Sequence, residues 1–146
     1  MPVGNIGRSK WELDTPALCV DIAALERNIA KMAEYAASRG LALRPHVKTH
    51  KCPAIAWMQL RAGAIGITCA KLSEAEVFAQ AGIRDLLIAN QIVGPLKIAR
   101  LVALARYTNL MVAVDDADNA GAISSAAVAR GAEVGVLVEV DVGMQR

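Results

Sequence analysis

The residues best suited to chemistry in this sequence surround one lysine, because both histidines of the chain flank it. Lys48 stands between His46 and His50 in residues 44–51 (RPHVKTHK). A lysine at the inner end of a buried strand is costly to keep charged, and neighbouring cations oppose its charge as well. An amine that loses its proton is a nucleophile towards aldehydes, which is the property that a Schiff-base lysine needs. The alternative interpretation is that Lys48 is simply the first exposed residue after a strand.

Other polar side chains follow apolar runs where strands are predicted to end. Reacting groups gather at the carboxyl ends of parallel strands, so these residues are candidates for binding or catalysis. They are Lys71, Asn90, Gln91, Asp115, Asp116, Glu139, Asp141 and Arg146. Arg146 could donate to an oxyanion or a phosphate, or be a surface arginine without a partner. Asn90 and Gln91 could bind a ligand or cap the next turn, and Asp116 is best explained as a helix N-cap.

Two carboxylates alternate with apolar residues in the last predicted strand. One face of that strand could therefore carry Glu139 and Asp141 together, or they could be ion-pair partners of Lys48 or Arg146. Two histidines are too few for a metal site by themselves, and the sequence shows no metal-ligand spacing. No metal-binding residue is therefore predicted in this chain.

Two periodicities alternate along the chain and predict the elements that position these residues. Apolar runs predict strands over residues 17–21, 41–48, 64–70, 85–90, 109–115 and 133–141. Helical spacing or helix-start signals predict helices over residues 22–39, 53–61, 73–82, 95–106 and 117–130. Gly40 and Gly63 stand where helix C-terminal caps are expected, and Leu72 or Ser73 is the predicted N-cap of the third helix.

The strands are almost wholly apolar, which is typical of parallel strands buried on both faces. Five consecutive strand–helix units, with strand ends about 20 to 26 residues apart, predict an α/β fold. The spacing suits a barrel or an open doubly wound sheet, and the lack of a GxGxxG motif disfavours dinucleotide binding. An eight-stranded barrel typically needs about 250 residues, and this sequence ends directly after a strand. We therefore expect the chain to be incomplete.

Composition excludes several classes of protein. The chain has 146 residues, a net charge of +2 and no basic cluster, which argues against nucleic acid as a partner. The N-terminus lacks the apolar core of a signal peptide, and no run approaches the roughly 18 apolar residues of a membrane span, so a soluble protein is expected. Three cysteines without a CxxC pair fit a reducing cytoplasm, and Cys19 and Cys69 are predicted to be buried.

Several sequence blocks, in this order, resemble one family. The blocks are residues 14–18 (DTPAL), 20–21 (VD), 24–29 (ALERNI), 44–51 (RPHVKTHK), 69–76 (CAKLSEAE) and 138–143 (VEVDVG). The chain from Trp11 onward is similar to the fold-type III pyridoxal-phosphate enzymes. Its lysine segment resembles the branch that contains D-threonine aldolase, 3-hydroxy-D-aspartate aldolase and eukaryotic-type D-serine dehydratase.

The resemblance implies a (β/α)8 TIM-type barrel of the alanine-racemase N-terminal kind, with about five of its eight strands in this chain. Residues 1–16 are expected to form an N-terminal arm and residues 17–146 a partial cofactor-binding barrel, with a C-terminal β domain absent from the chain. It implies Lys48 as the catalytic lysine that carries pyridoxal 5′-phosphate, and Arg146 and His50 as further cofactor-binding residues. A divalent metal is implied too, with ligands and phosphate-binding loops outside this chain, and a homodimer is implied for the full-length protein.

The resemblance also implies a function for the full-length protein. The leading hypothesis is a lyase that cleaves β-hydroxy-D-amino acids, such as D-threonine, to glycine and an aldehyde through a Lys48 Schiff base. The alternatives are a D-serine dehydratase, which yields pyruvate and ammonia, and a non-catalytic pyridoxal-phosphate-binding protein or inactive fragment. The isolated chain of 146 residues is expected to be inactive.

Overall fold

A parallel four-stranded sheet forms the centre of the protein in a computed structural model that describes residues 5–144. The strands are β1 (Ile67–Cys69), β2 (Asp85–Ile88), β3 (Asn109–Val114) and β4 (Gly135–Val138). They lie side by side in sequence order, with Ile67 opposite Leu86 and Leu86 opposite Leu110. Each strand is shorter than the apolar run that predicts it.

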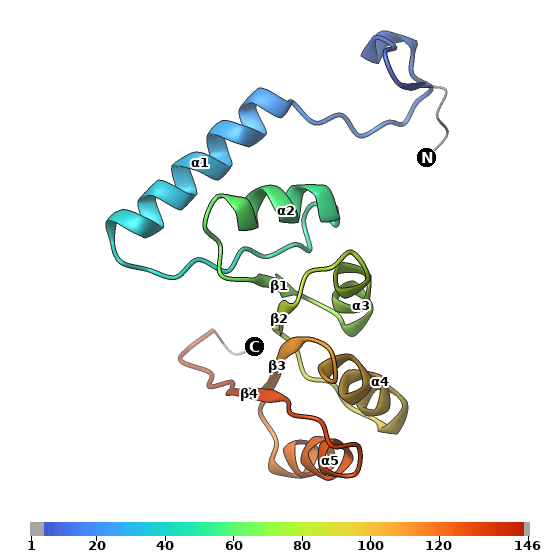
Figure 1. Cartoon of the computed structure of the whole chain (residues 1–146), viewed down its shortest axis with the longest axis vertical. Coiled ribbons are helices and arrows are strands. Elements are labelled where there is room, and N and C mark those ends of the chain that lie inside the picture. The colour runs from blue at the N-terminus through green and yellow to red at the C-terminus, as the bar shows by residue number, and fades with distance from the viewer. Residues whose placement is uncertain (1–4, 145–146) are drawn as a thin grey trace.

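The helices distinguish between the two predicted folds. They are the 3-10 turn η2 (Lys10–Glu12) and the helices α1 (Ile22–Ser38), α2 (Pro53–Arg61), α3 (Leu72–Gln80), α4 (Pro95–Ala105) and α5 (Ala117–Val128). Helices α3, α4 and α5 join successive strands and lie on one side of the sheet, while α1 and α2 lie beyond its β1 edge (Figure 1). A doubly wound sheet reverses its strand order and carries helices on both faces, whereas consecutive order with helices outside builds a barrel wall. The prediction of a (β/α) barrel is therefore confirmed over the doubly wound alternative.

Local signals in the sequence set most helix ends. Asp116 caps α5 by accepting a hydrogen bond from Asn119 N at 2.7 Å, as predicted. Asp21, which was predicted to end a strand, caps α1 by accepting from Ala24 N at 2.9 Å. Gly40, just after α1, has a φ of +63°, the left-handed conformation that glycine adopts at little cost. No helix in the described part of the chain is both long and apolar enough to cross a membrane.

The predicted N-cap of α3 is wrong. The helix begins at Leu72, so the N-cap is Lys71, and no side chain bonds the first-turn amides in the usual capping manner. The first turn instead contains Glu74, whose carboxylate accepts from the amide of Ala70, one residue before the cap.

The predicted strand over residues 17–21 is also wrong. This segment forms no strand. It precedes α1 and lies away from the sheet (Figure 1). Apolar residues form a strand only beside another strand that pairs with their backbone, and no described strand lies next to these. Cys19 is consequently exposed rather than buried, whereas Cys69 in β1 is fully buried as predicted.

The segment predicted as a strand over residues 41–48 runs parallel to β1 without becoming a regular strand. Thr68 N donates to Pro45 O at 2.7 Å, and Val47 N donates to Thr68 O at 2.8 Å. Pro45 has no N–H group, so it cannot donate to the ladder, and a continuous strand is not possible there. The pairing is nevertheless enough to fix the course of the backbone that leads to Lys48.

The apolar core lies between the sheet and helices α3, α4 and α5. Its largest fully buried side chains are Phe78, Ile67, Ile83, Leu86, Ile88, Leu101, Leu104, Leu110, Ile123, Val47, Val102 and Val112. Burying one such side chain contributes about 1.5–3 kcal/mol. The predicted burial on both faces holds for β1, where all three residues are buried, but not for β4, where Val136, Leu137 and Val138 are exposed. Nothing in the described chain packs beyond β4, which is the edge strand.

Candidate functional site

A cavity of about 590 Å³ lies at the carboxyl ends of the strands. Its walls come from the segment beside β1 and from the residues that follow β1, β2 and β4. They are His46, Lys48, Ala70, Ala89, Asn90, Gln91, Glu139, Val140, Asp141, Val142 and Met144. The structure thus brings five of the predicted strand-end residues together with His46, while Lys71 and Asp115 do not line the cavity.

Backbone pairing beside β1 places Lys48 in the wall of this cavity. Val47, the residue before it, is fully buried and bonded to Thr68, so the chain direction at Lys48 is fixed. Lys48 itself is exposed among the described residues, not buried as a lysine at the inner end of a strand would be. Within residues 5–144 its ammonium group forms no hydrogen bond or ion pair. The amine is therefore free to react with a molecule in the cavity.

His46 is a titratable neighbour of Lys48 in the cavity wall. Its Nδ1 accepts the backbone N–H of Lys48 at 3.2 Å, so a neutral ring carries its proton on Nε2. Burial lowers the pKa of His46, and the Lys48 cation lowers it further, while Glu74 and the Thr68 backbone act in the opposite direction. The net direction favours the neutral ring, with Nε2–H as a hydrogen-bond donor.

Glu74 links the lysine segment to the end of β1. Its Oε1 accepts from Lys51 Nζ in an ion pair, and its Oε2 accepts from Ala70 N at 2.8 Å. Burial tends to raise the pKa of the Glu74 carboxyl, but the bonds from Lys51 and Ala70 outweigh it, and the pKa is lowered. The sequence interpretation missed Glu74 because it looked only like part of a helix start, and no local pattern relates it to a lysine 23 residues earlier.

The remaining polar residues of the cavity wall bond to one another. Gln91 Nε2 donates to Glu139 Oε2 at 2.7 Å, and Asn90 Nδ2 donates to Ala70 O at 3.2 Å. Asn90 Oδ1 also accepts from Gln91 N at 3.0 Å, so Asn90 does cap the turn after its strand. Asp141 Oδ1 accepts a backbone amide two residues later at 2.9 Å. These bonds connect the ends of β1, β2 and β4 around Lys48.

The structure does not bring His50 to this cavity. His50 lines a separate cavity of about 450 Å³ between α1 and α2, where its Nδ1 accepts from Cys52 N at 3.1 Å. Burial lowers the pKa of His50, opposed by Gln59 and by the Cys52 backbone. Its role as a cofactor-binding residue stays a prediction. Arg146 lies outside the described residues, so its role stays a prediction as well.

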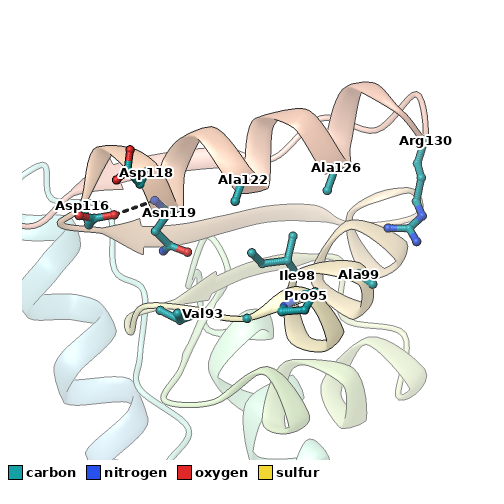
Figure 2. Close-up of a pocket in the computed structure, with 11 residues that line it drawn as sticks. Val93, Pro95, Ile98, Ala99, Asp116, Asp118, Asn119, Ala122, Ala126 and Arg130 are labelled. Carbon is teal, nitrogen blue, oxygen red and sulfur yellow. Dashed lines mark hydrogen bonds between the residues drawn. The ribbon is translucent and has the colours of Figure 1, made fainter.

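A groove between α4 and α5 forms another cavity, of about 550 Å³ (Figure 2). Apolar residues such as Ile98 and Ala122 line its middle, and Asp116 and Arg130 lie at its opposite ends. Asp116 is already engaged as the N-cap of α5. The carboxylates and the guanidinium of this groove therefore lie at opposite ends, with an apolar stretch between them.

Thiol and metal-ligating groups do not form a second centre in the described part of the chain. Burial raises the pKa of the Cys69 thiol to about 12, and the charge of Glu74 acts in the same direction, so Cys69 is a protonated core residue rather than a nucleophile. No group of three or more His, Cys, Asp or Glu side chains within residues 5–144 is arranged to hold a metal ion. The reactive groups of the described residues therefore gather around Lys48.

Comparison with known proteins finds close similarity along nearly the whole chain. The sequence model of the alanine racemase N-terminal domain matches residues 20–146. A D-threonine aldolase from an Arthrobacter species is 51% identical over 145 residues, which cover 99% of this chain and 38% of that protein. A 3-hydroxy-D-aspartate aldolase from Paracoccus denitrificans is 42% identical over 142 residues, covering 96% of this chain and 37% of that protein.

A solved structure agrees with these sequence matches. The crystal structure of D-threonine aldolase from Filomicrobium marinum matches this chain with a TM-score of 0.89 and 48% identity. The match covers 91% of this chain and 36% of that one, so the chain spans less than two fifths of the length of these three relatives.

Proposed function

The chain belongs to the alanine racemase N-terminal domain family, and from that premise we propose that its protein is a pyridoxal-phosphate-dependent lyase that cleaves β-hydroxy-D-amino acids. The products are glycine and an aldehyde. The observation that carries the proposal is the unpaired amine of Lys48, which faces a cavity at the carboxyl ends of parallel strands. The two relatives that are aldolases by name support the choice of reaction.

The residues of the cavity fit the carbonyl end of pyridoxal phosphate. A cofactor held through its aldehyde needs an amine that is not already bonded to a carboxylate, and Lys48 meets that requirement within residues 5–144. The cavity of about 590 Å³ has room for a small ring. We infer that Lys48 holds the cofactor, with His46 beside it as a neutral hydrogen-bond donor.

The proposed reaction has a simple balance. The Cα–Cβ bond of the substrate breaks, the β-hydroxyl loses its proton as its carbon becomes an aldehyde, and Cα gains a proton to become glycine. When bound, pyridoxal phosphate supplies a conjugated ring that accepts the electron pair released at Cα. The chain's own residues fix the backbone that carries the Lys48 amine through the pairing at Val47. They also hold the Glu139 carboxylate in one orientation through Gln91 Nε2.

The test is a product assay on the full protein with D-threonine. Glycine and acetaldehyde are expected in equal amounts. Lys48→Ala should abolish both the activity and the incorporation of cofactor at residue 48 after borohydride reduction, measured by peptide mass. Lys97→Ala is the control, because Lys97 is an exposed lysine on α4 away from the cavity. Full aldolase activity in Lys48→Ala would overturn the proposal.

The same assay separates the alternatives. A 2-oxo acid and ammonia from D-serine, without glycine, would identify a dehydratase. Cofactor incorporation at Lys48 without turnover of either substrate would identify a pyridoxal-phosphate-binding protein. Either outcome would leave the assignment of the fold unchanged and would change only the reaction assigned to the protein.

Further features of the full protein belong to the same proposal. We propose that Arg146 and His50 contribute to cofactor binding, and that the enzyme is a cytoplasmic homodimer with a C-terminal β domain. We also propose that a divalent metal supports the reaction, with ligands from outside this chain. A metal bound to the substrate's β-hydroxyl would lower the pKa of that group and orient the leaving aldehyde. Loss of activity with a chelator, and its return with added metal, is the expected result.

A further inference from the structure

The turn that carries Lys48 has an uncommon backbone conformation. Lys51 N donates to Val47 O at 2.8 Å and closes a single turn around Lys48. Lys51 ends this turn with a φ of 47°, the one positive φ of a residue other than glycine within residues 5–144. Residues with side chains seldom adopt this left-handed conformation, and it persists only where surrounding contacts hold it. A contact that holds Lys51 therefore also holds the turn of Lys48.

The side chain of Lys51 forms an ion pair with the carboxylate of Glu74. The Glu74 side chain is 10% exposed, whereas that of Lys51 is 62% exposed, so the carboxylate is the fixed member of the pair. The second carboxylate oxygen is occupied by Ala70 N at 2.8 Å. With both oxygens bonded, Glu74 has a defined orientation and can transmit it to the lysine turn.

Ala70 extends this arrangement to the cavity itself. Ala70 lines the cavity with Lys48, and its carbonyl oxygen accepts from Asn90, another residue of the wall. The Glu74 carboxylate thus connects the turn of Lys48 to the end of β1 and, through it, to the end of β2. Glu76, two residues along α3, makes an ion pair with Arg100 on α4 and contacts neither the turn nor the cavity wall.

We infer that Glu74 is a positioning residue for Lys48, acting through Lys51 and the Ala70 amide. The inference rests on the proposed function, in which Lys48 holds the cofactor. Loss of the carboxylate frees the turn at Lys51 from the end of β1. The amine of Lys48 is then spread over more positions and reacts more slowly with the cofactor's carbonyl group.

The experiment measures reaction at Lys48 directly, in the full protein freed of cofactor. Pyridoxal phosphate is added, samples are reduced with borohydride at intervals, and the modified Lys48 peptide is quantified by mass. The variants are Glu74→Ala, Glu74→Gln and Lys51→Met, with Glu76→Ala and Glu76→Gln as matched controls on the same helix. NMR titration of the His46 ring gives a second readout, since the Glu74 charge raises the pKa of that ring.

Glu74→Ala is expected to slow modification of Lys48 by about tenfold or more, because misplacement of a reacting group is costly. Glu74→Gln keeps an acceptor for Ala70 N and should recover part of the rate. Lys51→Met keeps the Ala70 bond and loses the ion pair, so it should lie between Glu74→Ala and the parent. Both Glu74 variants should lower the pKa of His46, and both Glu76 variants should match the parent in rate and pKa.

Equal rates in the parent, Glu74→Gln and Lys51→Met would overturn the inference, whether or not Glu74→Ala folds. So would an equal loss of rate in the Glu76 controls, because that pattern indicates general damage to α3. Failure of the proposed function looks different, since the parent itself would then show no preferred modification at Lys48.

Discussion

The two ends of the parallel sheet differ in how completely their polar groups are paired. At the amino end, the Arg44 guanidinium forms an ion pair with Asp85 at the start of β2. The second oxygen of Asp85 accepts from Asn109 Nδ2, at the start of β3, at 2.7 Å. Gly66 leaves no spare room in this cluster, because a Cβ built there would lie 2.1 Å from Arg44 Nη1. The amino end is closed by mutual contacts.

At the carboxyl end, the same sheet leaves a reactive group unpaired. Lys48 faces the cavity without a partner among residues 5–144, while its neighbours Gln91 and Glu139 bond to each other. In barrel folds the amino ends of the strands serve stability and the carboxyl ends carry the chemistry. The comparison therefore predicts that substitutions at one end affect folding, and substitutions at the other affect reaction.

The largest effect is expected from Lys48→Ala, which should abolish activity and leave stability nearly unchanged. The side chain is exposed and unpaired in the described chain, so the free energy of unfolding should change by no more than about 0.5 kcal/mol. Urea unfolding beside the product assay measures both quantities. A loss of several kcal/mol in the free energy of unfolding would mean that Lys48 supports the fold. The predicted division of the sheet into a stabilising amino end and a reactive carboxyl end would then be wrong.

Gly66→Ala, at the amino end of the sheet, should lower the stability of the protein and leave its reaction at Lys48 unchanged. The new Cβ would lie within 2.7 Å of Arg44, the Asp85 side chain and the Asp85 carbonyl oxygen, so the ion pair has to shift. We expect a loss of roughly 2 kcal/mol in the free energy of unfolding, while the folded protein keeps its reaction at Lys48.

Gly121→Ala on α5 is the matched control for that substitution. A Cβ at Gly121 meets nothing within 4 Å, so alanine should stabilise the helix by about 0.5–1 kcal/mol. If both variants lost equal stability in urea, the crowding at Gly66 would not be the cause.

Asp85→Asn tests the ion pair with a smaller change. The substitution leaves the Arg44 side chain, which is 16% exposed, without a charged partner. We expect a loss of about 1 kcal/mol. Asp115→Asn, at the exposed carboxyl end of β3, should change stability by less than about 0.5 kcal/mol. Equal effects of the two substitutions in urea unfolding would remove the distinction between the ends.

Local features of the fold could be predicted from the sequence, but pairing between distant residues could not. Asp116 and Gly40 act within one helix turn, so their spacing alone predicts the helix ends. The cap at Asp21 is equally local, but residues 17–21 were predicted as a strand. The Glu74–Lys51 and Arg44–Asp85 pairs join residues 23 and 41 positions apart, and they depend on which strands become neighbours.

The incorrect strand predictions have the same physical origin. Residues 17–21 look like a strand by their apolar character, but a strand also needs a neighbour, and none is present in the described chain. The segment over residues 41–48 has a neighbour and is interrupted at Pro45, a signal that was readable in the sequence. Lys48 was predictable because polar residues after apolar runs mark strand ends. No local pattern predicts that His50, two residues later, lines a different cavity.

The smallest predicted effect is a pH dependence of stability that comes from the residues flanking Lys48. Burial lowers the pKa of both His46 and His50 below the ordinary value of 6.5. Between the lowered values and 6.5, the unfolded chain binds more protons than the folded one, so stability is highest above 6.5 and falls as the pH falls below it. Urea midpoints at about pH 7.5 and 5.5 should show this decrease, and His46→Asn together with His50→Gln should reduce it. A midpoint that rises on acidification, or an unchanged slope in the double variant, would show that these rings do not link protonation to folding.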